Sequence, residues 1–245
     1  MTEVVVKLEN LSKSFGSNHV LREFSMNLYS SENLVVLGKS GSGKSVLIKC
    51  IIGLLTPDNG CIKVFGHDIS AFNREEMDQM RVEVGFLFQS NALYDSMTVR
   101  ENLEFPLRRH WDDEKHNKDE VENLVMEVLE NVGLSHTVDM MPAELSGGMR
   151  KRIALARTLI LRPKIILYDE PTTGLDPITA REISKLILAV QKKYNTSSII
   201  ISHDMNCIRM ISNRVGMLID GKCYAEGSYS QLAASSDPKI YEFFA

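Results

Sequence analysis

The sequence predicts an α/β fold in which a largely parallel sheet is covered by helices on both faces. Short, largely apolar segments at residues 34–37, 165–168 and 198–201 have the length and composition of buried strands. Longer segments with helical periodicity lie between them. Buried apolar strands that alternate with helices are typical of a parallel sheet enclosed by two helical layers.

The N-terminal part of the chain is rich in predicted strands. Residues 4–8 and 20–28 carry β-favouring side chains with partial alternation, and the turn-like residues 15–18 separate them. A helix is expected at residues 46–55 and a further strand at residues 61–65. We therefore expect an N-terminal β subdomain beside the main sheet.

A helical block interrupts the strands in the middle of the chain. Apolar residues recur at three- and four-residue steps within residues 98–140, and residues 108–120 are polar enough to form a surface connection. A second stripe, Met149, Ile153, Ala156 and Ile160, predicts another helix. We expect residues 98–161 to form an inserted α-helical subdomain, with the core made of residues 1–97 and 162–245.

The composition is that of a globular protein, and the charge argues against a nucleic-acid backbone as the main ligand. The 245 residues carry a net charge of -4, whereas proteins that bind nucleic-acid backbones have a basic surplus. The four cysteines form no C-x-x-C pair and are expected to be small hydrophobic residues in or near the core of a protein in a reducing compartment. The N-terminus has no signal-peptide pattern, and no apolar run approaches the roughly 18 residues of a membrane span, so we expect a soluble cytosolic chain.

A glycine-rich loop follows the strand at residues 34–37. It fits the pattern G-x-x-x-x-G-K-[ST] and reads Gly38, Lys39, Ser40, Gly41, Ser42, Gly43, Lys44 and Ser45. Glycines let the backbone N–H groups converge on phosphate oxygens, and the helix that follows presents its positive end to the same anion. Lys44 can reach the β- and γ-phosphates, and the Ser45 hydroxyl can bind Mg²⁺.

A second strand ends in two carboxylates, Asp169 and Glu170. The buried strand at residues 165–168 brings Asp169 to the edge where the phosphate loop lies, so it can hold Mg²⁺ directly or through water. Glu170 is one residue further on and points elsewhere. It is placed to polarise a water molecule as a general base.

A third loop separates this chain from other P-loop NTPases. Leu145 precedes Ser146, Gly147 and Gly148, in which Ser146 is a good N-cap and the glycines expose N–H groups at a helix start. This segment resembles the signature motif of ABC ATPases. The resemblance implies an α/β P-loop NTPase core with a mixed sheet, an N-terminal antiparallel β subdomain and an inserted α-helical subdomain.

Other landmarks of that family occur in order along nearly the whole chain. Phe15 matches the aromatic residue that stacks on adenine, and Gln89 matches the glutamine that senses Mg²⁺ and the attacking water. Asp176, in Gly174-Leu175-Asp176, matches the loop that crosses to a partner subunit. His203 matches the switch histidine that contacts the γ-phosphate.

The resemblance implies an ATPase that uses ATP and Mg²⁺ and works as a pair of identical chains. ATP on the phosphate loop of one chain would be capped by the Ser146 loop of the other. The residues expected to be catalytic are Lys44, Gln89, Glu170 and His203. The residues expected to hold Mg²⁺ are Ser45, Gln89 and Asp169.

Finer details are similar to Mla/Mce-type lipid-transport ATPases. These details are Met149-Arg150-Lys151-Arg152 after the signature, the segment 169–178 and the terminal segment 236–244. The resemblance implies an integral membrane permease as partner, an MCE-type lipid-binding subunit, and a peripheral position on the cytoplasmic face of the inner membrane. Residues 89–95 are expected to line the groove that accepts the permease.

Three alternatives stay open at this stage. The chain could serve another ABC transporter, such as an amino-acid importer or a lipoprotein exporter, with the same catalytic residues. A soluble ABC ATPase of DNA repair or translation fits less well, because those proteins need long coiled coils or tandem cassettes. A regulatory module without turnover is disfavoured by the presence of Glu170 and His203.

Overall fold

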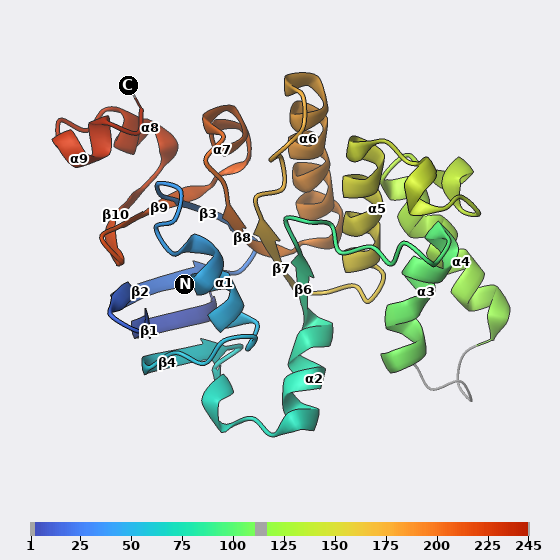
Figure 1. Cartoon of the computed structure of the whole chain (residues 1–245), viewed down its shortest axis with the longest axis horizontal. Coiled ribbons are helices and arrows are strands. Elements are labelled where there is room, and N and C mark those ends of the chain that lie inside the picture. The colour runs from blue at the N-terminus through green and yellow to red at the C-terminus, as the bar shows by residue number, and fades with distance from the viewer. Residues whose placement is uncertain (1–2, 111–116, 245) are drawn as a thin grey trace.

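The computed structural model describes residues 3–110 and 117–244, and it contains a mixed six-stranded sheet (Figure 1). The strand order is β10-β9-β3-β8-β7-β6, and only the edge strand β10 runs antiparallel to its neighbour. The strands are β3 (Asn33–Leu37), β6 (Val84–Leu87), β7 (Ile165–Asp169), β8 (Ser197–Ile201), β9 (Arg214–Ile219) and β10 (Lys222–Gly227). The α/β class and the mixed sheet expected from the sequence are confirmed.

The central strands are mostly apolar because both of their faces are covered. Successive side chains of β3 enter different cores: Val35 and Leu37 join one cluster, whereas Leu34 and Val36 join the other. β7 and β8 alternate in the same way. The carboxyl ends of β3, β8 and β7 therefore lie side by side at one edge, which is where ligands bind in open α/β sheets.

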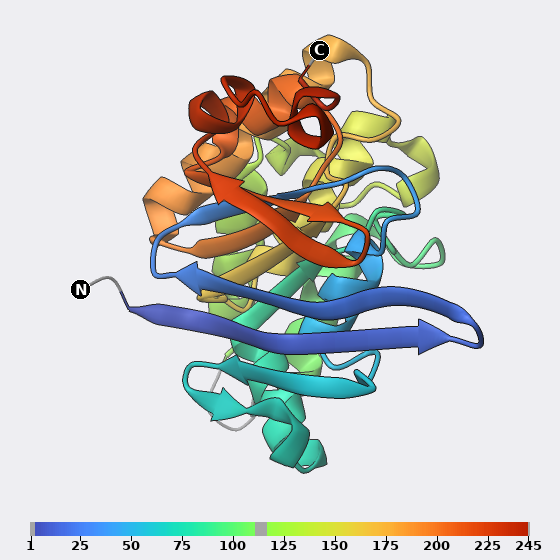
Figure 2. The ribbon, with the colours of Figure 1, turned by 90° about the vertical axis from the view of Figure 1, so that its left-hand side faces the viewer.

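A four-stranded antiparallel sheet forms a separate layer (Figure 2). Its order is β2-β1-β4-β5, with β1 (Val4–Phe15), β2 (Asn18–Tyr29), β4 (Asn59–Val64) and β5 (His67–Asp68). β1 and β2 are longer than the strands expected at residues 4–8 and 20–28. Asn10 and Glu23 have positive φ, and the register shifts between Leu8 and Leu11, so the alternation breaks although the ladder continues.

One core lies between the two sheets and is closed by α1 (Lys44–Ile51) and α2 (Arg74–Glu83). The helix expected at residues 46–55 begins two residues earlier and ends at Ile51. Gly53 has φ +70°, and the N–H groups of Leu54 and Leu55 turn back to the carbonyl of Lys49, which stops the helix. Helix α2 was not expected from the sequence, because most of its residues are charged.

The other core is covered by the remaining helices. They are α3 (Val99–His110), α4 (Lys118–Asn131), α5 (Gly147–Leu159), α6 (Pro177–Tyr194), α7 (Met205–Ile211), α8 (Tyr229–Ala233) and α9 (Pro238–Tyr241), with short 3-10 turns at Ile69–Ala71, Ser135–Thr137 and Pro142–Glu144. The bounds predicted for the polar connection, residues 108–120, were wrong at both ends, because α3 continues to His110 and α4 starts at Lys118. Its central residues, 111–116, lie outside the described part. No helix within residues 3–110 or 117–244 is long and apolar enough to cross a bilayer.

The helical block is not isolated from the sheet. α5 packs on α3 and α4, and also on β6 and α6, so one hydrophobic cluster is shared by the block and the core. The division into a core of residues 1–97 and 162–245 and a helical subdomain of residues 98–161 stays a prediction.

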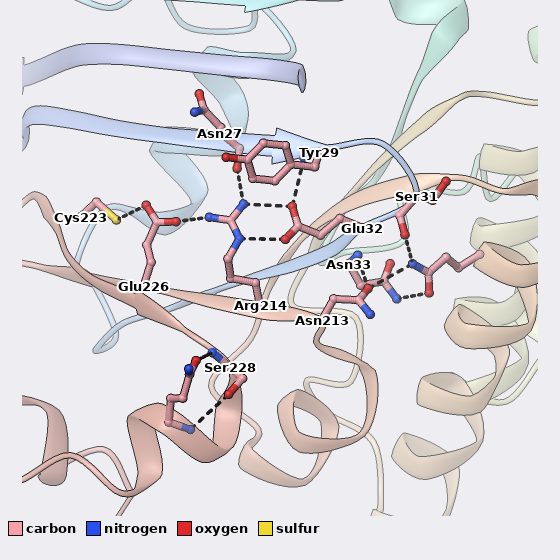
Figure 3. A network of polar contacts seen from close by, with 12 residues as sticks. Asn27, Tyr29, Ser31, Glu32, Asn33, Asn213, Arg214, Cys223, Glu226 and Ser228 are labelled. Carbon is pink, nitrogen blue, oxygen red and sulfur yellow. Dashed lines mark hydrogen bonds and ion pairs between the residues drawn. The ribbon is translucent and has the colours of Figure 1, made fainter. Parts of the chain in front are cut away.

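A polar junction joins the strands at the edge opposite the carboxyl ends (Figure 3). Arg214, at the start of β9, donates to both carboxylate oxygens of Glu32 at 2.8 and 2.9 Å and to the carbonyl of Asn27. It also pairs with Glu226 on β10 and lies over the ring of Tyr29. A planar guanidinium suits this site because it satisfies several acceptors at once.

Replacing Arg214 with Met should lower the free energy of unfolding by about 3 kcal/mol, because the mostly buried Glu32 carboxylate would lose its counter-charge. Arg108→Met is the matched control: it breaks the exposed i,i+4 pair with Glu104 and should cost less than about 1 kcal/mol. Urea unfolding of the three proteins measures both changes. Equal losses in the two variants would mean that the junction is no more important than a surface pair.

Candidate functional site

A cavity of about 690 Å³ lies where the carboxyl ends of β3, β6, β7 and β8 meet the β1–β2 turn. It gathers most of the residues expected from the sequence. Its lining includes Phe15, Gly38, Lys39, Ser40, Gly41, Gly43, Lys44, Ser45, Gln89, Glu170 and His203. Ser42 instead lines a neighbouring cavity of about 580 Å³ on the other side of the glycine-rich loop.

The glycine-rich loop holds its backbone in a form that favours an anion. Gly41 and Gly43 have φ of +75° and +104°, a region that side chains rarely adopt. A Cβ on Gly43 would come within 2.6 Å of Val20, so this position also needs the missing side chain. Gly43 is the N-cap of α1 and supplies no side-chain cap, so the first N–H groups of the helix are left for a ligand.

Lys44 points back along this loop. Its Nζ donates to the carbonyls of Gly38 at 2.8 Å and Lys39 at 3.0 Å, and its side chain is only 7% exposed. Burial lowers the pKa of Lys44, and the negative charges of Glu170 and Asp169 oppose that shift. A phosphate group in the cavity can replace the neutral carbonyls with a charged acceptor.

The donor set beside Lys44 fits a magnesium ion. The Ser45 hydroxyl donates to Asp169 Oδ1 at 3.0 Å, and Gln89 lines the same cavity. Burial raises the pKa of Asp169, so its ionised form lacks a full counter-charge. Hydroxyl, carboxylate and amide oxygens suit Mg²⁺, which is held through one or two carboxylates and completes its shell with water and phosphate.

Glu170 is held by the turn that follows β7. Its φ is +51°, and its N–H donates to the carbonyl of Ile201 at 3.0 Å. The carboxylate oxygen Oε2 lies 2.8 Å from His203 Nδ1 and accepts from the Thr173 hydroxyl at 3.1 Å. A non-glycine residue in this conformation is strained, and such strain persists where the surroundings hold the residue in place. His203 is 64% exposed and therefore open to the cavity.

Phe15 forms the apolar rim of the cavity. It ends β1 and is 48% exposed, with Lys13 Nζ 5.6 Å from the ring centroid. An exposed aromatic ring at a cavity mouth offers a stacking surface to a flat ligand.

The serine–glycine–glycine loop and Asp176 are not part of this cavity. Ser146 is the N-cap of α5 and accepts from the N–H of Met149 at 3.2 Å, and Ser146 and Gly147 are exposed. A Cβ on Gly148 would come within 2.6 Å of Thr179, so this glycine lets α5 approach the start of α6. Asp176 caps α6 by accepting from two backbone N–H groups, and the Thr179 hydroxyl lowers its pKa. One chain therefore presents two separate surfaces suited to phosphate.

Three features of the site were not expected from the sequence. Glu242 and Phe243 line the cavity from the C-terminal end, about 200 residues away in sequence from Lys39, and Met205 joins them. Lys151 on α5 is 2% exposed and donates to the backbone carbonyl of Gln89 at 2.9 Å. Lys151 and Glu242 both lie in segments that resemble lipid-transport ATPases, but nothing in the sequence placed either side chain at the nucleotide site.

Comparison with protein families finds a match to the ABC transporter model over residues 21–173. A probable ribonucleotide transport ATP-binding protein, mkl, of Mycobacterium leprae is 39% identical over 98% of this chain and 68% of its own length. The intermembrane phospholipid transport system ATP-binding protein MlaF of Haemophilus influenzae is 35% identical over 99% and 91%. The methionine import ATP-binding protein MetN of Campylobacter jejuni is 33% identical over 98% and 75%.

Two solved structures share the fold. The dimeric ATP-binding cassette MJ0796, in a post-hydrolysis state bound to ADP and Pi, is 30% identical with a TM-score of 0.83 over 91% of this chain and 98% of its own. The cbiO1 protein of Clostridium perfringens, part of the cbiONQ transporter complex, is 29% identical with a TM-score of 0.86 over 95% and 92%.

Asp169→Asn should stabilise the nucleotide-free protein while it lowers ATP hydrolysis. An amide keeps an acceptor for the Ser45 hydroxyl but removes a buried charge that stands beside Glu170. A gain of about 1 kcal/mol raises the Tm of a domain of this size by about 2–4 °C, whereas ATPase activity should fall at least about 100-fold. Calorimetry and a phosphate-release assay measure the two effects, and a fall in both stability and activity would contradict this interpretation of the site.

Proposed function

The chain belongs to the ABC transporter family and is an ATPase, and we propose that it works as one of a head-to-tail pair that energises a separate membrane permease. One observation carries the proposal. The ATP-binding cavity contains the phosphate loop, Glu170 and His203, but the exposed Ser146 loop lies outside it. A second copy can supply that loop.

A pair of chains related by a two-fold axis would form two equivalent composite sites. Each γ-phosphate would lie between the phosphate loop of one chain and the N–H groups of Gly147 and Gly148 on the other. Neither surface alone encloses the anion, so ATP would hold the pair together and hydrolysis would loosen it. The dimeric form of the similar MJ0796 cassette supports this arrangement.

Within each site the chain's own groups position and polarise the reactants. The N–H groups after Gly43 and the Lys44 ammonium bind the phosphates, and Phe15 stacks on the adenine. The Glu170 contacts with Thr173 and His203 both fall on Oε2, so Oε1 can accept the proton of an attacking water. His203 donates from Nδ1 to that carboxylate and presents its exposed ring toward the γ-phosphate.

Mg²⁺ would be held by Ser45, Asp169 and Gln89, and it would neutralise charge that develops on the phosphate oxygens. Lys151 holds the Gln89 backbone from the helix that begins at the Ser146 loop. Gln89 would thereby follow movements of α5, which links the metal site to the surface that meets the partner.

The permease surface is proposed at residues 89–95 and the adjoining helices. Tyr94 and Phe105 are exposed and lie with ring centroids 4.8 Å apart, and Arg157 donates to the carbonyls of Asn91 and Ala92. A cavity of about 310 Å³, lined in part by Phe88 and Arg157, lies beside them. An exposed aromatic pair with an adjoining hollow suits an inserted helix of a partner.

Phospholipid is the proposed cargo, with the chain held peripherally at the cytoplasmic face of the inner membrane. The similarity to MlaF over nearly both full lengths supports this, as does the Met149–Arg152 segment after the Ser146 loop. An MCE-type lipid-binding subunit would complete the system. A small-molecule importer is the second candidate, because relatives named for ribonucleotide transport and methionine import are of comparable identity.

Complementation tests the composite sites. Lys44→Met and Ser146→Arg should each abolish turnover in a pure preparation. An equal mixture should regain up to about a quarter of wild-type ATPase activity, because half of the pairs are mixed and each has one intact site. Lys44→Met mixed with Glu170→Gln is the matched control: both changes damage the same half-site, so it should stay inactive. Mixtures as inactive as the single variants, despite confirmed exchange of chains, would contradict the head-to-tail pair.

Phe105→Ala combined with Tyr94→Ala should reduce co-purification of the membrane subunit by at least about tenfold, because loss of central aromatic contacts costs about 2 kcal/mol or more. ATPase activity of the isolated chain should stay unchanged. Tyr241→Ala removes a tyrosine on α9 that is even more exposed than Tyr94, and it serves as control. Undiminished recovery of the membrane subunit with the double variant would place the interface elsewhere.

The cargo is tested on the complex that co-purifies from membranes. Mass spectrometry of the bound molecules should find phospholipid, and phospholipid should stimulate ATP hydrolysis by the complex. A complex that holds and responds to an amino acid or a nucleoside instead would support the importer and contradict lipid transport.

A further inference from the structure

The C-terminal segment reaches the mouth of the ATP-binding cavity. Glu242 and Phe243 line that cavity, and Glu242 Oε1 lies 2.9 Å from the Nζ atom of Lys39 in the phosphate loop. Lys39, Glu242 and Phe243 also line the neighbouring cavity on the far side of the loop. The Lys39–Glu242 pair therefore stands between the two cavities, at the entrance for nucleotide.

Several contacts hold this segment in place independently of Glu242. Asp237 caps α9 and accepts from the Tyr224 hydroxyl at 2.8 Å, and Lys239 pairs with Asp220 at 3.1 Å. Phe244 packs edge-on against Tyr229, and its side chain lies on the main core. The fold thus places the Glu242 carboxylate beside the glycine-rich loop, which binds the negatively charged phosphates of the nucleotide.

The pair is suited to exchange partners. Both side chains are about two-thirds exposed, at 65% for Lys39 and 63% for Glu242. An exposed pair of this kind is weak, and a phosphate oxygen is a stronger acceptor for an ammonium group than a solvated carboxylate. Nucleotide in the cavity also adds negative charge beside Glu242, which favours separation of the pair.

We propose that Glu242 tunes nucleotide affinity by competing with nucleotide phosphate for Lys39. Without nucleotide, the side-chain carboxylate of Glu242 pairs with Lys39 and neutralises its charge. With nucleotide bound, Lys39 turns to the phosphates and Glu242 is left without its partner. The segment thus weakens binding, and it weakens it most for the nucleotide that carries the most phosphate charge.

Nucleotide titrations of Glu242→Gln test the competition. The affinity for a non-hydrolysable ATP analogue should rise about 2–5-fold, that for ADP less, and that for AMP hardly at all. The gain should shrink in 300 mM salt, where exposed charges are screened. In steady-state assays KM for ATP should fall while kcat stays within error. Melting temperature checks that the exposed substitution leaves the fold intact.

Two further variants separate this competition from a general effect of charge. In a Lys39→Met background, Glu242→Gln should change affinity by less than half as much as in the wild type. Glu23→Gln removes another exposed acid, which pairs with Lys222, without touching Lys39 or the contacts that hold the C-terminal segment, and it should leave nucleotide affinity within about 1.5-fold. An undiminished gain in the Lys39→Met background, an equal gain from Glu23→Gln, or no gain from Glu242→Gln would each overturn the proposal. ATP hydrolysis that persists in all of these cases would leave the assigned ATPase activity intact.

Discussion

The site depends on the placement of charge at the carboxyl edge of the six-stranded sheet. β3 and β7 flank β8, so the phosphate loop and the Asp169–Glu170 pair meet at one edge and the Ser45 hydroxyl reaches Asp169. Lys44, Asp169 and Glu170 are all buried there. Burial disfavours the charged forms of Lys44 and Asp169, as the directions of their pKa shifts show. Such an arrangement is costly in the free protein and becomes favourable when phosphate and a divalent cation complete it.

The surface formed by the Ser146 loop and the Asp176 turn is exposed, unlike the buried charges of the cavity. The Ser146 loop is exposed, and Gly148 lets the start of α5 approach Thr179 on α6. The Asp176 side chain is held at the start of α6, where Oδ1 accepts from the N–H groups of Ile178 and Thr179. The start of α5 and the Asp176 turn thus lie close together, outside the cavity of the same chain. Because the Ser146 loop lies outside the cavity of its own chain, a single chain can bind a triphosphate but cannot enclose it on all sides.

Short sequence motifs predicted those parts of the site whose structure depends on a few neighbouring residues. The glycine-rich loop, the acidic strand end and the capped helix after Ser146 each carry their physical reason within a few residues, and the fold brings the first two together. Positions that depend on packing were harder to foresee. The end of α1 is decided by Gly53, and the full lengths of β1 and β2 are concealed by positive φ at Asn10 and Glu23. The approach of Glu242 to Lys39 spans 203 residues, and no periodicity or motif encodes it.

The central claim is that ATP joins two copies of this chain, and sedimentation of the Glu170→Gln variant measures it directly. With ATP and Mg²⁺ the variant should sediment with twice the mass of the free chain, and with ADP it should return to the mass of one chain. A variant that binds ATP to saturation yet keeps the mass of a single chain at every protein concentration would contradict the account.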